Sequence, residues 1–242
     1  LLHDVICFFD SRKRGCRLIG IVVALSEELK VLLSLMDDME QSEIQNTIFF
    51  TGHLNGRAVV VVQSQVGKVN AAISTMLLLS RFAVSVVINI GSAGGLGCNI
   101  NTLDVVISER TKQYDTNFEF KGQPSFFEAD SKLLAYSEKV GDQLQDIKIQ
   151  RGFIVSGDLF VSTEVSEKIT EKYPMALCCD METAAVANVC WRMEIPFLGI
   201  RGVSDVPAAG NNKIVFDQNV VQAANNCVRA MLAVFAQMDQ GT

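Results

Sequence analysis

Three carboxylates follow apolar runs in this sequence and could take part in acid–base chemistry. Glu28 lies, with Glu27, at the start of a predicted helix that follows the apolar run at 17–25. Glu182 lies in the first turn of another predicted helix, and Asp205 ends the run "FLGIRGVSD". A carboxylate in a partly desolvated cleft can act as a general base, or as a general acid when its pKa is raised. Each position also has a structural explanation, because acids favour the first turn of a helix and aspartate often caps a helix or closes a turn.

The segment "CCDMETAAV" (178–186) carries two acids and two thiols. Asp180 is a plausible helix N-cap, and this role accounts less well for Glu182 because one cap suffices. A carboxylate can accept two hydrogen bonds from a sugar diol, so Glu182 could bind a ribose. Cys178 and Cys179 lie in a predicted buried strand without a nearby histidine to activate them, so we expect neither to be a nucleophile.

Two further features could bind a flat ligand. The glycine-rich "GSAGG" (91–95) follows a predicted strand and could bring backbone N–H groups close to a ligand, or could be a plain turn. Phe160 follows the sharp exit of another strand and could stack on a base, or could belong to the core. Neither feature alone identifies a function.

Strands and helices alternate along the chain. Apolar or β-branched runs predict strands at 17–25, 46–54, 57–64, 84–90, 103–110, 149–158, 176–180 and 197–205. Helical spacing predicts helices at 27–36, with Ser26 as N-cap, and at 68–82, 129–144, 165–173, 181–193 and 217–237. Asn55-Gly56 between two strands predicts a hairpin. The pattern predicts a single α/β domain with a central, mostly parallel, partly mixed sheet flanked by helices.

In such sheets, ligands bind beyond the carboxyl ends of the strands. The acids, the glycine-rich segment, the "SGD" at 156–158 and Ser204-Asp205 all fall at predicted strand ends. We therefore expect these groups, which are far apart in sequence, to converge on one rim of the sheet.

Composition narrows the function. The 242 residues are 49% hydrophobic with a net charge of −6, which is typical of a globular chain and disfavours a nucleic-acid binder. The longest apolar runs are too short to span a membrane. Seven cysteines without a C-x-x-C pair, and only two histidines, predict reduced thiols of a cytoplasmic protein and no metal site. Residues 1–17 differ in pattern and are interpreted as an extension of unknown role before a domain at 18–242.

Six segments, taken in order, resemble the 5′-methylthioadenosine/S-adenosylhomocysteine nucleosidases of the nucleoside phosphorylase superfamily. The resemblance covers residues 18 to about 238 and is carried by "IGIVVALSEEL", "GHLNGRAVVVVQSQVGKVNAA", "VINIGSAGGL", "GFIVSGDLFV", "DMETAAVANVC" and "IRGVSDV". It implies a nucleoside phosphorylase-like fold and hydrolysis of the N-glycosidic bond of 5′-thio-substituted adenosines. It further implies a homodimer that needs no cofactor.

The resemblance also implies roles for individual residues. Glu28 would activate the attacking water, and Asp205 would protonate N7 of adenine. A further set would hold the ribose, the base or the wall of the pocket: Ser92, Gly94, Phe160, Val161, Met181, Glu182, Ser204, Val66 and Phe216.

One difference from the phosphorylases of the superfamily bears on the reaction, and one departure from the nucleosidase pattern bears on the substrate. Phosphorylases of the superfamily usually carry an arginine three residues before the serine of the glycine-rich segment, where this chain has Asn89; a phosphate would lack a partner there, which favours water as the nucleophile. The segment 112–127 is shorter than the corresponding loop of the family. The resemblance therefore specifies the 5′ substituent of the substrate less closely than it specifies which bond is broken. Hydrolysis of futalosine or adenosine, phosphorolysis, and a nucleoside-binding protein without turnover remain as alternatives.

Overall fold

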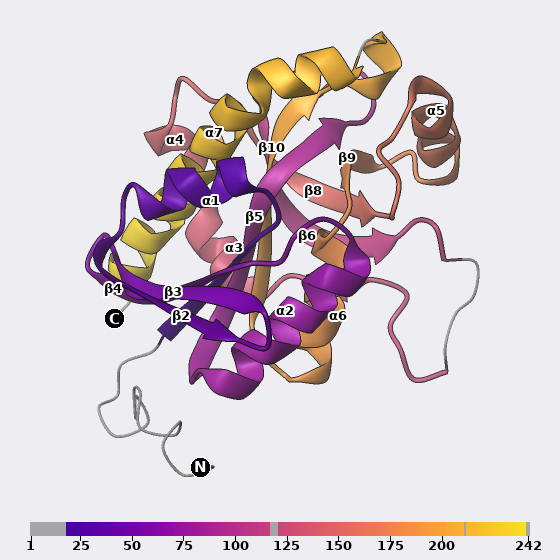
Figure 1. The fold of residues 1–242 in the computed structure, drawn as a ribbon. Coiled ribbons are helices and arrows are strands. Elements are labelled where there is room, and N and C mark those ends of the chain that lie inside the picture. Colours follow the sequence, from indigo (N-terminus) through magenta and orange to yellow (C-terminus); the bar gives the residue numbers. More distant parts are fainter. Residues whose placement is uncertain (1–17, 117–120, 211, 241–242) are drawn as a thin grey trace.

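The computed structural model describes residues 18–116, 121–210 and 212–240, so the predicted extension 1–17 lies outside the described residues. A single sheet forms the middle of the molecule, and helices cover both of its faces (Figure 1). Its strands are β1 (Leu18–Val23), β2 (Asp37–Ile44), β3 (Thr47–Leu54), β4 (Arg57–Gln63), β5 (Val84–Gly95), β6 (Val105–Gln113), β7 (Phe127–Glu128), β8 (Ile149–Ser156), β9 (Ala176–Asp180) and β10 (Phe197–Asp205). The helices are α1 (Ser26–Leu33), α2 (Lys68–Arg81), α3 (Ser131–Ser137), α4 (Val140–Gln143), α5 (Thr163–Lys172), α6 (Thr183–Arg192) and α7 (Asn212–Gln240), with a short 3₁₀ helix η2 (Pro207–Ala209).

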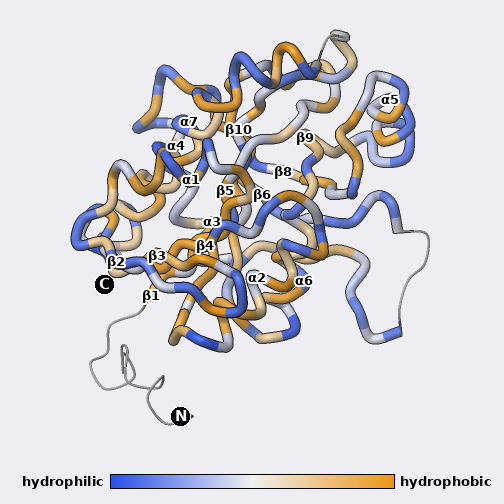
Figure 2. Tube along the Cα trace, viewed as in Figure 1, coloured by the Kyte–Doolittle hydropathy of each residue, from blue (hydrophilic) through white to orange (hydrophobic). Residues whose placement is uncertain are grey.

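The central strands are buried on both faces, which explains their near-continuous apolar sequences. In β1, Ile19 and Ile21 pack into the cluster that includes residues of α1 and α7, while Leu18 and Val22 pack on the other face with residues of α2 and α6. In Figure 2 the apolar colour is concentrated along these inner strands. The predicted α/β domain, with a sheet flanked by helices, is therefore confirmed.

The sheet consists of two parallel groups that meet in antiparallel pairs. Strands β4, β1, β5 and β10 run parallel to one another, and so do β6, β8 and β9. Strands β2 and β3 continue the first group in antiparallel pairing, and β7 pairs antiparallel with β6. The groups join through the antiparallel pairs β10–β6 and β5–β9. As a result, β5, β10, β6, β8 and β9 form a closed ring of paired strands, and the sheet is more evenly mixed than the sequence pattern predicted.

Strand β5 changes its neighbour on one edge. It pairs with β1 as far as Asn89, which lies opposite Val22, and it pairs with β9 only from Gly94, which lies opposite Cys179. Its other edge pairs with β10 throughout this region. The two neighbours thus diverge beside Ser92 and open a crevice at the carboxyl ends of the strands, where ligands bind in open α/β sheets.

The predicted hairpin is confirmed. Strands β3 and β4 pair up to Leu54 and Arg57, and the two turn residues both have positive φ, 51° at Asn55 and 75° at Gly56. Two central residues with φ above zero define the type I′ turn, which Asn-Gly favours.

Several element boundaries differ from the predictions. The helix predicted at 129–144 is two helices, α3 and α4, and Gly141, a weak helix former, lies in the second. Helix α7 begins at Asn212, before the predicted start. Strand β2 was not predicted because it lies at the sheet edge with almost every residue exposed, so its sequence has no apolar alternation. Within the described ranges, no helix is both long and apolar enough to cross a membrane.

Candidate active site

Glu28 lies at the crevice and is held by four hydrogen-bond donors. Its Oε2 accepts from the backbone N–H groups of Ala24 (3.1 Å) and Leu25 (3.0 Å). Its Oε1 accepts from the N–H (2.8 Å) and the hydroxyl (3.0 Å) of Ser92. The Ser92 N–H lies in the part of β5 where β1 has ended and β9 has not begun, so a side chain takes the place of a strand partner. These four donors fix the orientation of the Glu28 carboxylate.

The same contacts correct one prediction about α1. Leu25, not Ser26, occupies the N-cap position, and Glu28 itself bonds the cap residue's N–H. The Ser26 hydroxyl donates instead to Glu27. The Glu28 side chain therefore bonds the residue at the N-terminus of α1 and points toward β5, whereas Glu27 does not line the pocket.

Gly91 lets two charged side chains approach β5. A Cβ at this position would lie 2.2 Å from Nη1 of Arg201 and 2.9 Å from Oε1 of Glu28. Both separations are far below van der Waals contact, so any other residue would push the two groups apart. The glycine-rich segment thus continues as strand and is not a turn, and its first glycine provides room for charged groups.

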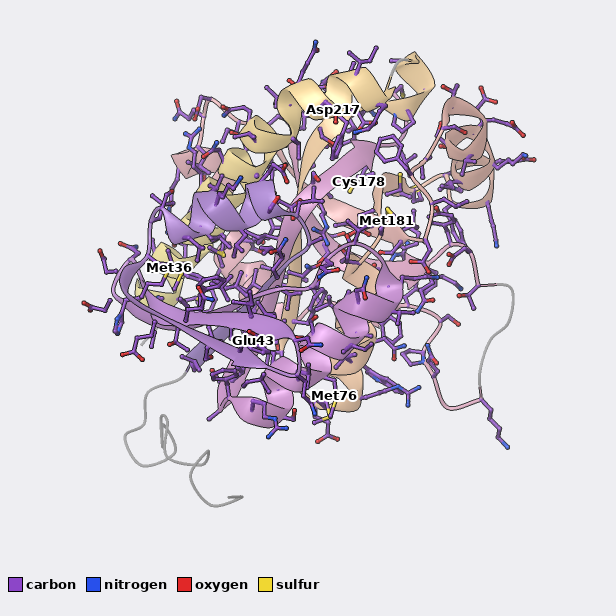
Figure 3. The ribbon with its side chains drawn as sticks, in the orientation of Figure 1. Met36, Glu43, Met76, Cys178, Met181 and Asp217 are labelled. Atoms are coloured by element: carbon purple, nitrogen blue, oxygen red, sulfur yellow. The ribbon has the colours of Figure 1, made fainter. Side chains whose placement is uncertain are left out.

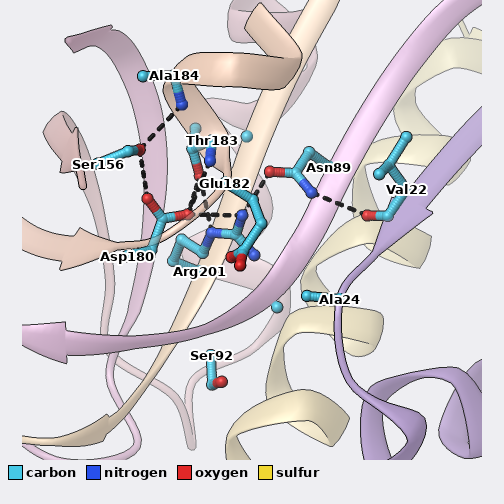
Figure 4. A network of polar contacts seen from close by, with 12 residues as sticks. Val22, Ala24, Asn89, Ser92, Ser156, Asp180, Glu182, Thr183, Ala184 and Arg201 are labelled. Carbon is cyan, nitrogen blue, oxygen red and sulfur yellow. Dashed lines mark hydrogen bonds and ion pairs between the residues drawn. The ribbon is translucent and has the colours of Figure 1, made fainter. Parts of the chain in front are cut away.

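A buried ion pair lies beneath the pocket (Figure 4). Nη2 of Arg201 is 2.6 Å from Oδ2 of Asp180, and both side chains are 1% exposed. The Thr183 hydroxyl donates to Asp180 and accepts from Nε of Arg201 (2.8 Å), and the Ser156 hydroxyl donates to the other carboxylate oxygen. Asn89 accepts from Nη2 of Arg201. Polar partners on three further elements, α6, β8 and β5, thus compensate for the cost of burying both charges.

Asp180 has more than the predicted capping role. Its Oδ2 accepts from the N–H of Thr183 (3.0 Å), at the first residue of α6, but Glu182 occupies the N-cap position. Its main partner is Arg201, which the sequence analysis did not single out. A charged residue in the middle of the apolar run "FLGIRGVSD" was the signal that could have identified it, since a buried arginine requires an anion.

Glu182 is buried beside this ion pair, and its Oε1 accepts from the N–H of Gly67 (2.8 Å). Burial, and then the nearby charge of Asp180, raise the pKa of Glu182 to about 8, while Arg201 and the Gly67 N–H oppose the shift. Gly67 has φ of 100°, a conformation that side chains other than glycine rarely adopt. Helix α2 therefore begins with an amide directed at Glu182.

Asp205 ends β10, which pairs with the other edge of β5, and it lines the same pocket as Glu28. The pairing with β5 shifts between Val203 and Asp205, and this irregularity places Asp205 opposite Gly94. The Ser204 hydroxyl donates to Oδ1 of Asp205 (2.8 Å) and contacts the Ala93 carbonyl (3.2 Å). A shift of this kind at a strand end redirects side chains, here so that both residues reach the pocket.

All the residues singled out by the resemblance line this one pocket: Glu28, Val66, Ser92, Gly94, Phe160, Val161, Met181, Glu182, Ser204, Asp205 and Phe216. The pocket also includes residues not predicted: Ala24, Leu25, Ala93, Leu159, Cys179, Asp180, Pro207 and Lys213. Phe160 lies at the mouth, 48% exposed, with its ring edge-on to that of Phe216 and a centroid separation of 5.6 Å.

The two neighbouring cysteines are part of the core. Cys178 and Cys179 are buried, and burial raises the pKa of both thiols well above the usual value. Neither is a thiolate at neutral pH, although Cys179 borders the pocket. Among the described residues, no group of three or more histidine, cysteine or acidic side chains could hold a metal ion.

Comparisons with known proteins give a consistent result. The sequence profile of the phosphorylase superfamily matches residues 18–236. A 5′-methylthioadenosine/S-adenosylhomocysteine nucleosidase from Oceanobacillus iheyensis is 36% identical over 225 residues, which cover 88% of this chain and 96% of the relative. The structure of such a nucleosidase from Colwellia psychrerythraea, in complex with adenine, has a TM-score of 0.87 and 31% identity and covers 92% of this chain and 96% of that one. A futalosine hydrolase from Helicobacter pylori has a TM-score of 0.86 and 26% identity, and covers 92% of this chain and 99% of its own.

We expect Asp180→Ala to reduce the free energy of unfolding by about 3–5 kcal/mol, because Arg201 would be left buried without its anion. Urea denaturation followed by circular dichroism measures this. Asp217→Ala is the matched control, since it removes the partner of Lys213 from an exposed ion pair, and it should match the wild type within error. Equal effects of the two substitutions would contradict the importance of the buried pair.

Proposed function

The chain belongs to the phosphorylase superfamily, and from that premise we propose that it hydrolyses the bond between adenine and ribose in 5′-methylthioadenosine and S-adenosylhomocysteine. Curated relatives with this activity in their names match most of the chain, and structures of such nucleosidases share its fold. The pocket lined by Glu28, Glu182 and Asp205 supplies the acid–base groups that the reaction requires.

The observation that carries the proposal is that Glu28 occupies both hydrogen-bond donors of Ser92. A phosphate nucleophile would need such donors and would be repelled by the carboxylate that holds them. Asn89 offers no alternative, because its amide donates to the Val22 carbonyl (2.9 Å) and its oxygen accepts from Arg201. This side of the pocket is suited to a neutral water, so the proposed reaction is hydrolysis.

In the proposed reaction, the bond from C1′ of the ribose to N9 of adenine breaks and its electron pair moves to the base. Asp205 donates a proton to N7, so that the base leaves without a negative charge. Glu28 holds a water and takes one of its protons as the water oxygen bonds to C1′. The products are free adenine and the 5′-substituted ribose, and no cofactor takes part.

The remaining groups of the pocket would hold the nucleoside between these two acids. Glu182 would accept hydrogen bonds from the ribose hydroxyls, and Met181 would pack on the sugar. Phe160 would stack on adenine, and the backbone of Val161 would contact the base edge. Such positioning keeps the water and the leaving group in line. Holding reacting groups in this geometry supplies a large part of an enzyme's rate enhancement.

Two other functions fit the same fold. The futalosine hydrolase matches this chain about as well in shape as the adenine-bound nucleosidase does, so shape alone does not separate the substrates. Sequence identity to the structures favours the methylthioadenosine activity, at 31% for the adenine-bound nucleosidase against 26% for the futalosine hydrolase. A binding protein without turnover is disfavoured because the lining retains Glu28 and Asp205 together.

We also propose that the protein is a cytoplasmic homodimer. Helix α2 carries a row of exposed apolar side chains, Val69 (68%), Ile73 (53%) and Met76 (43%), the last of which is labelled in Figure 3. The row begins near Val66 at the pocket mouth, so a second copy on this face would border the site. The described cysteines are unpaired, which supports a reducing compartment.

The substrate assignment predicts which nucleosides release a free base. We expect adenine from 5′-methylthioadenosine and S-adenosylhomocysteine at the same rate with and without phosphate, measured by liquid chromatography. Adenosine and futalosine serve as comparison substrates. Release that requires phosphate would contradict hydrolysis, faster release from futalosine would reassign the substrate, and no release from any of the four would favour a binding protein.

Removal of the proposed acid predicts a loss of turnover with retained binding. We expect Asp205→Asn to lower kcat by about 100- to 10,000-fold, because general acid catalysis contributes on that scale. Isothermal titration calorimetry should still detect binding of 5′-methylthioadenosine. Asp146→Asn is the matched control, because Asp146 pairs with Arg229 on the surface and neither residue lines the pocket. Near-normal turnover of Asp205→Asn would remove Asp205 from its proposed role.

If the exposed apolar row on α2 forms the dimer interface, a charge placed in it should lower the mass of the protein in solution. We expect light scattering to give twice the chain mass for the wild type and the mass of one chain for Ile73→Glu. Val221→Glu, which alters an exposed apolar residue on α7, should remain dimeric. A monomeric wild type would contradict the proposal.

A further inference from the structure

Three charged residues connect separate segments beside the pocket. Lys68 begins α2, Asp115 follows β6, and Asp158 follows β8. The Lys68 N–H donates to Oδ1 of Asp158 (2.8 Å), and the Asp158 N–H donates to Oδ2 of Asp115 (3.0 Å). Nζ of Lys68 closes the cycle at 2.5 Å from Oδ1 of Asp115 and 3.7 Å from Oδ2 of Asp158. Each segment is thus held by the other two; we call these residues the Lys68 cluster.

One end of the cluster adjoins the group proposed to hold the ribose. The N–H of Gly67 donates to Oε1 of Glu182 (2.8 Å), and the next N–H, that of Lys68, donates to Asp158. Two consecutive amides at the start of one helix therefore bind carboxylates from two different segments. A shift of this helix start would move the donor of Glu182 as well.

The other end adjoins the residues proposed to hold the base. Leu159, Phe160 and Val161 follow Asp158 directly, and all three line the pocket. Val161 is buried in the core, but Leu159 is 54% and Phe160 48% exposed, so core packing does not fix the positions of these two. The polar contacts of Asp158 are the constraint immediately before them.

We propose that Lys68, Asp115 and Asp158 are positioning residues, which fix the ribose-binding Glu182 relative to the base-binding residues Phe160 and Val161. This inference rests on the proposed function, which assigns ribose binding to Glu182 and base binding to Phe160 and Val161. The side chains of the cluster are 15%, 27% and 49% exposed, so its ion pairs contribute little to global stability. A displacement of about 1 Å at a reacting group can lower the rate on the order of 100-fold, so activity should respond far more strongly than stability.

The pH dependence of activity gives a second signature. Glu182 must be ionised to accept from two ribose hydroxyls, and the Gly67 N–H is one of the groups that lower its raised pKa. The other charges near Glu182 are Asp180 on β9, Arg201 on β10 and Glu28 on α1, and a change at Lys68 alters none of them. If the start of α2 moves away from Glu182, the pKa of Glu182 rises further. As the pH is lowered, activity then begins to fall at a higher pH than in the wild type.

The test compares Lys68→Met with Lys68→Arg and with Lys168→Met. The last is a matched control, because it removes an exposed ion pair to Glu164 on α5 that has no contact with the pocket lining. For Lys68→Met we expect kcat/KM for 5′-methylthioadenosine to fall by about 10- to 100-fold. Its acid limb should move to higher pH, and the urea midpoint should stay near that of the wild type. Lys68→Arg should recover most of the activity, and Lys168→Met should match the wild type.

Hydrogen–deuterium exchange tests the structural claim without turnover. We expect faster exchange at 64–68 and at 158–161 together in Lys68→Met, and no change at either segment in Lys168→Met. Unchanged exchange at both segments, or a loss of activity that only follows the loss of folded protein with an unchanged pH profile, would overturn the proposal. A wild type that releases no base would instead contradict the proposed function, and the exchange result would still decide whether the cluster holds the two segments.

Discussion

The divergence of β1 and β9 on one edge of β5 is the constraint on which the site depends. It leaves the Ser92 N–H without a strand partner, and a buried donor requires an acceptor, which Glu28 supplies. The other edge of β5 stays paired with β10, which ends in Asp205. The proposed base and the proposed acid are thus held by different neighbours of one strand, and both line the same pocket.

Charge balance is the second requirement, because acidic side chains crowd a space with little water. Arg201 is almost fully buried and pairs directly with Asp180, which removes one anion from the neighbourhood of Glu182. The hydrogen bonds of Thr183 and Asn89 tie the arginine to α6 and β5, so the ion pair also links the elements around the pocket. Burial, and then the remaining influence of the Asp180 charge, raise the pKa of Glu182, where the proposed ribose contact lies.

Much of this organisation could be predicted from the sequence, and the exceptions have physical reasons. Apolar runs identified the inner strands because burial on both faces requires them, and the strand-end rule gathered Glu28, Glu182 and Asp205. Arg201 was missed because its partner Asp180 is 21 residues away by number and adjacent only through the fold. Strand β2 was missed because an exposed edge has no apolar pattern, and Ser26 was mistaken for the N-cap of α1, a position that Leu25 occupies.

The closed ring of β5, β10, β6, β8 and β9 has a consequence for how new specificities could arise. Every strand in the ring has two neighbours, so an insertion or deletion inside one would break pairing on both sides and displace Gly94, which pairs with β9 and β10 at once. The segments that follow ring strands, such as 158–162 after β8 and 206–210 after β10, lie outside the strand pairing, so a change in their length does not break it. Substrate range can therefore diversify through these segments while the bond-breaking geometry is inherited intact.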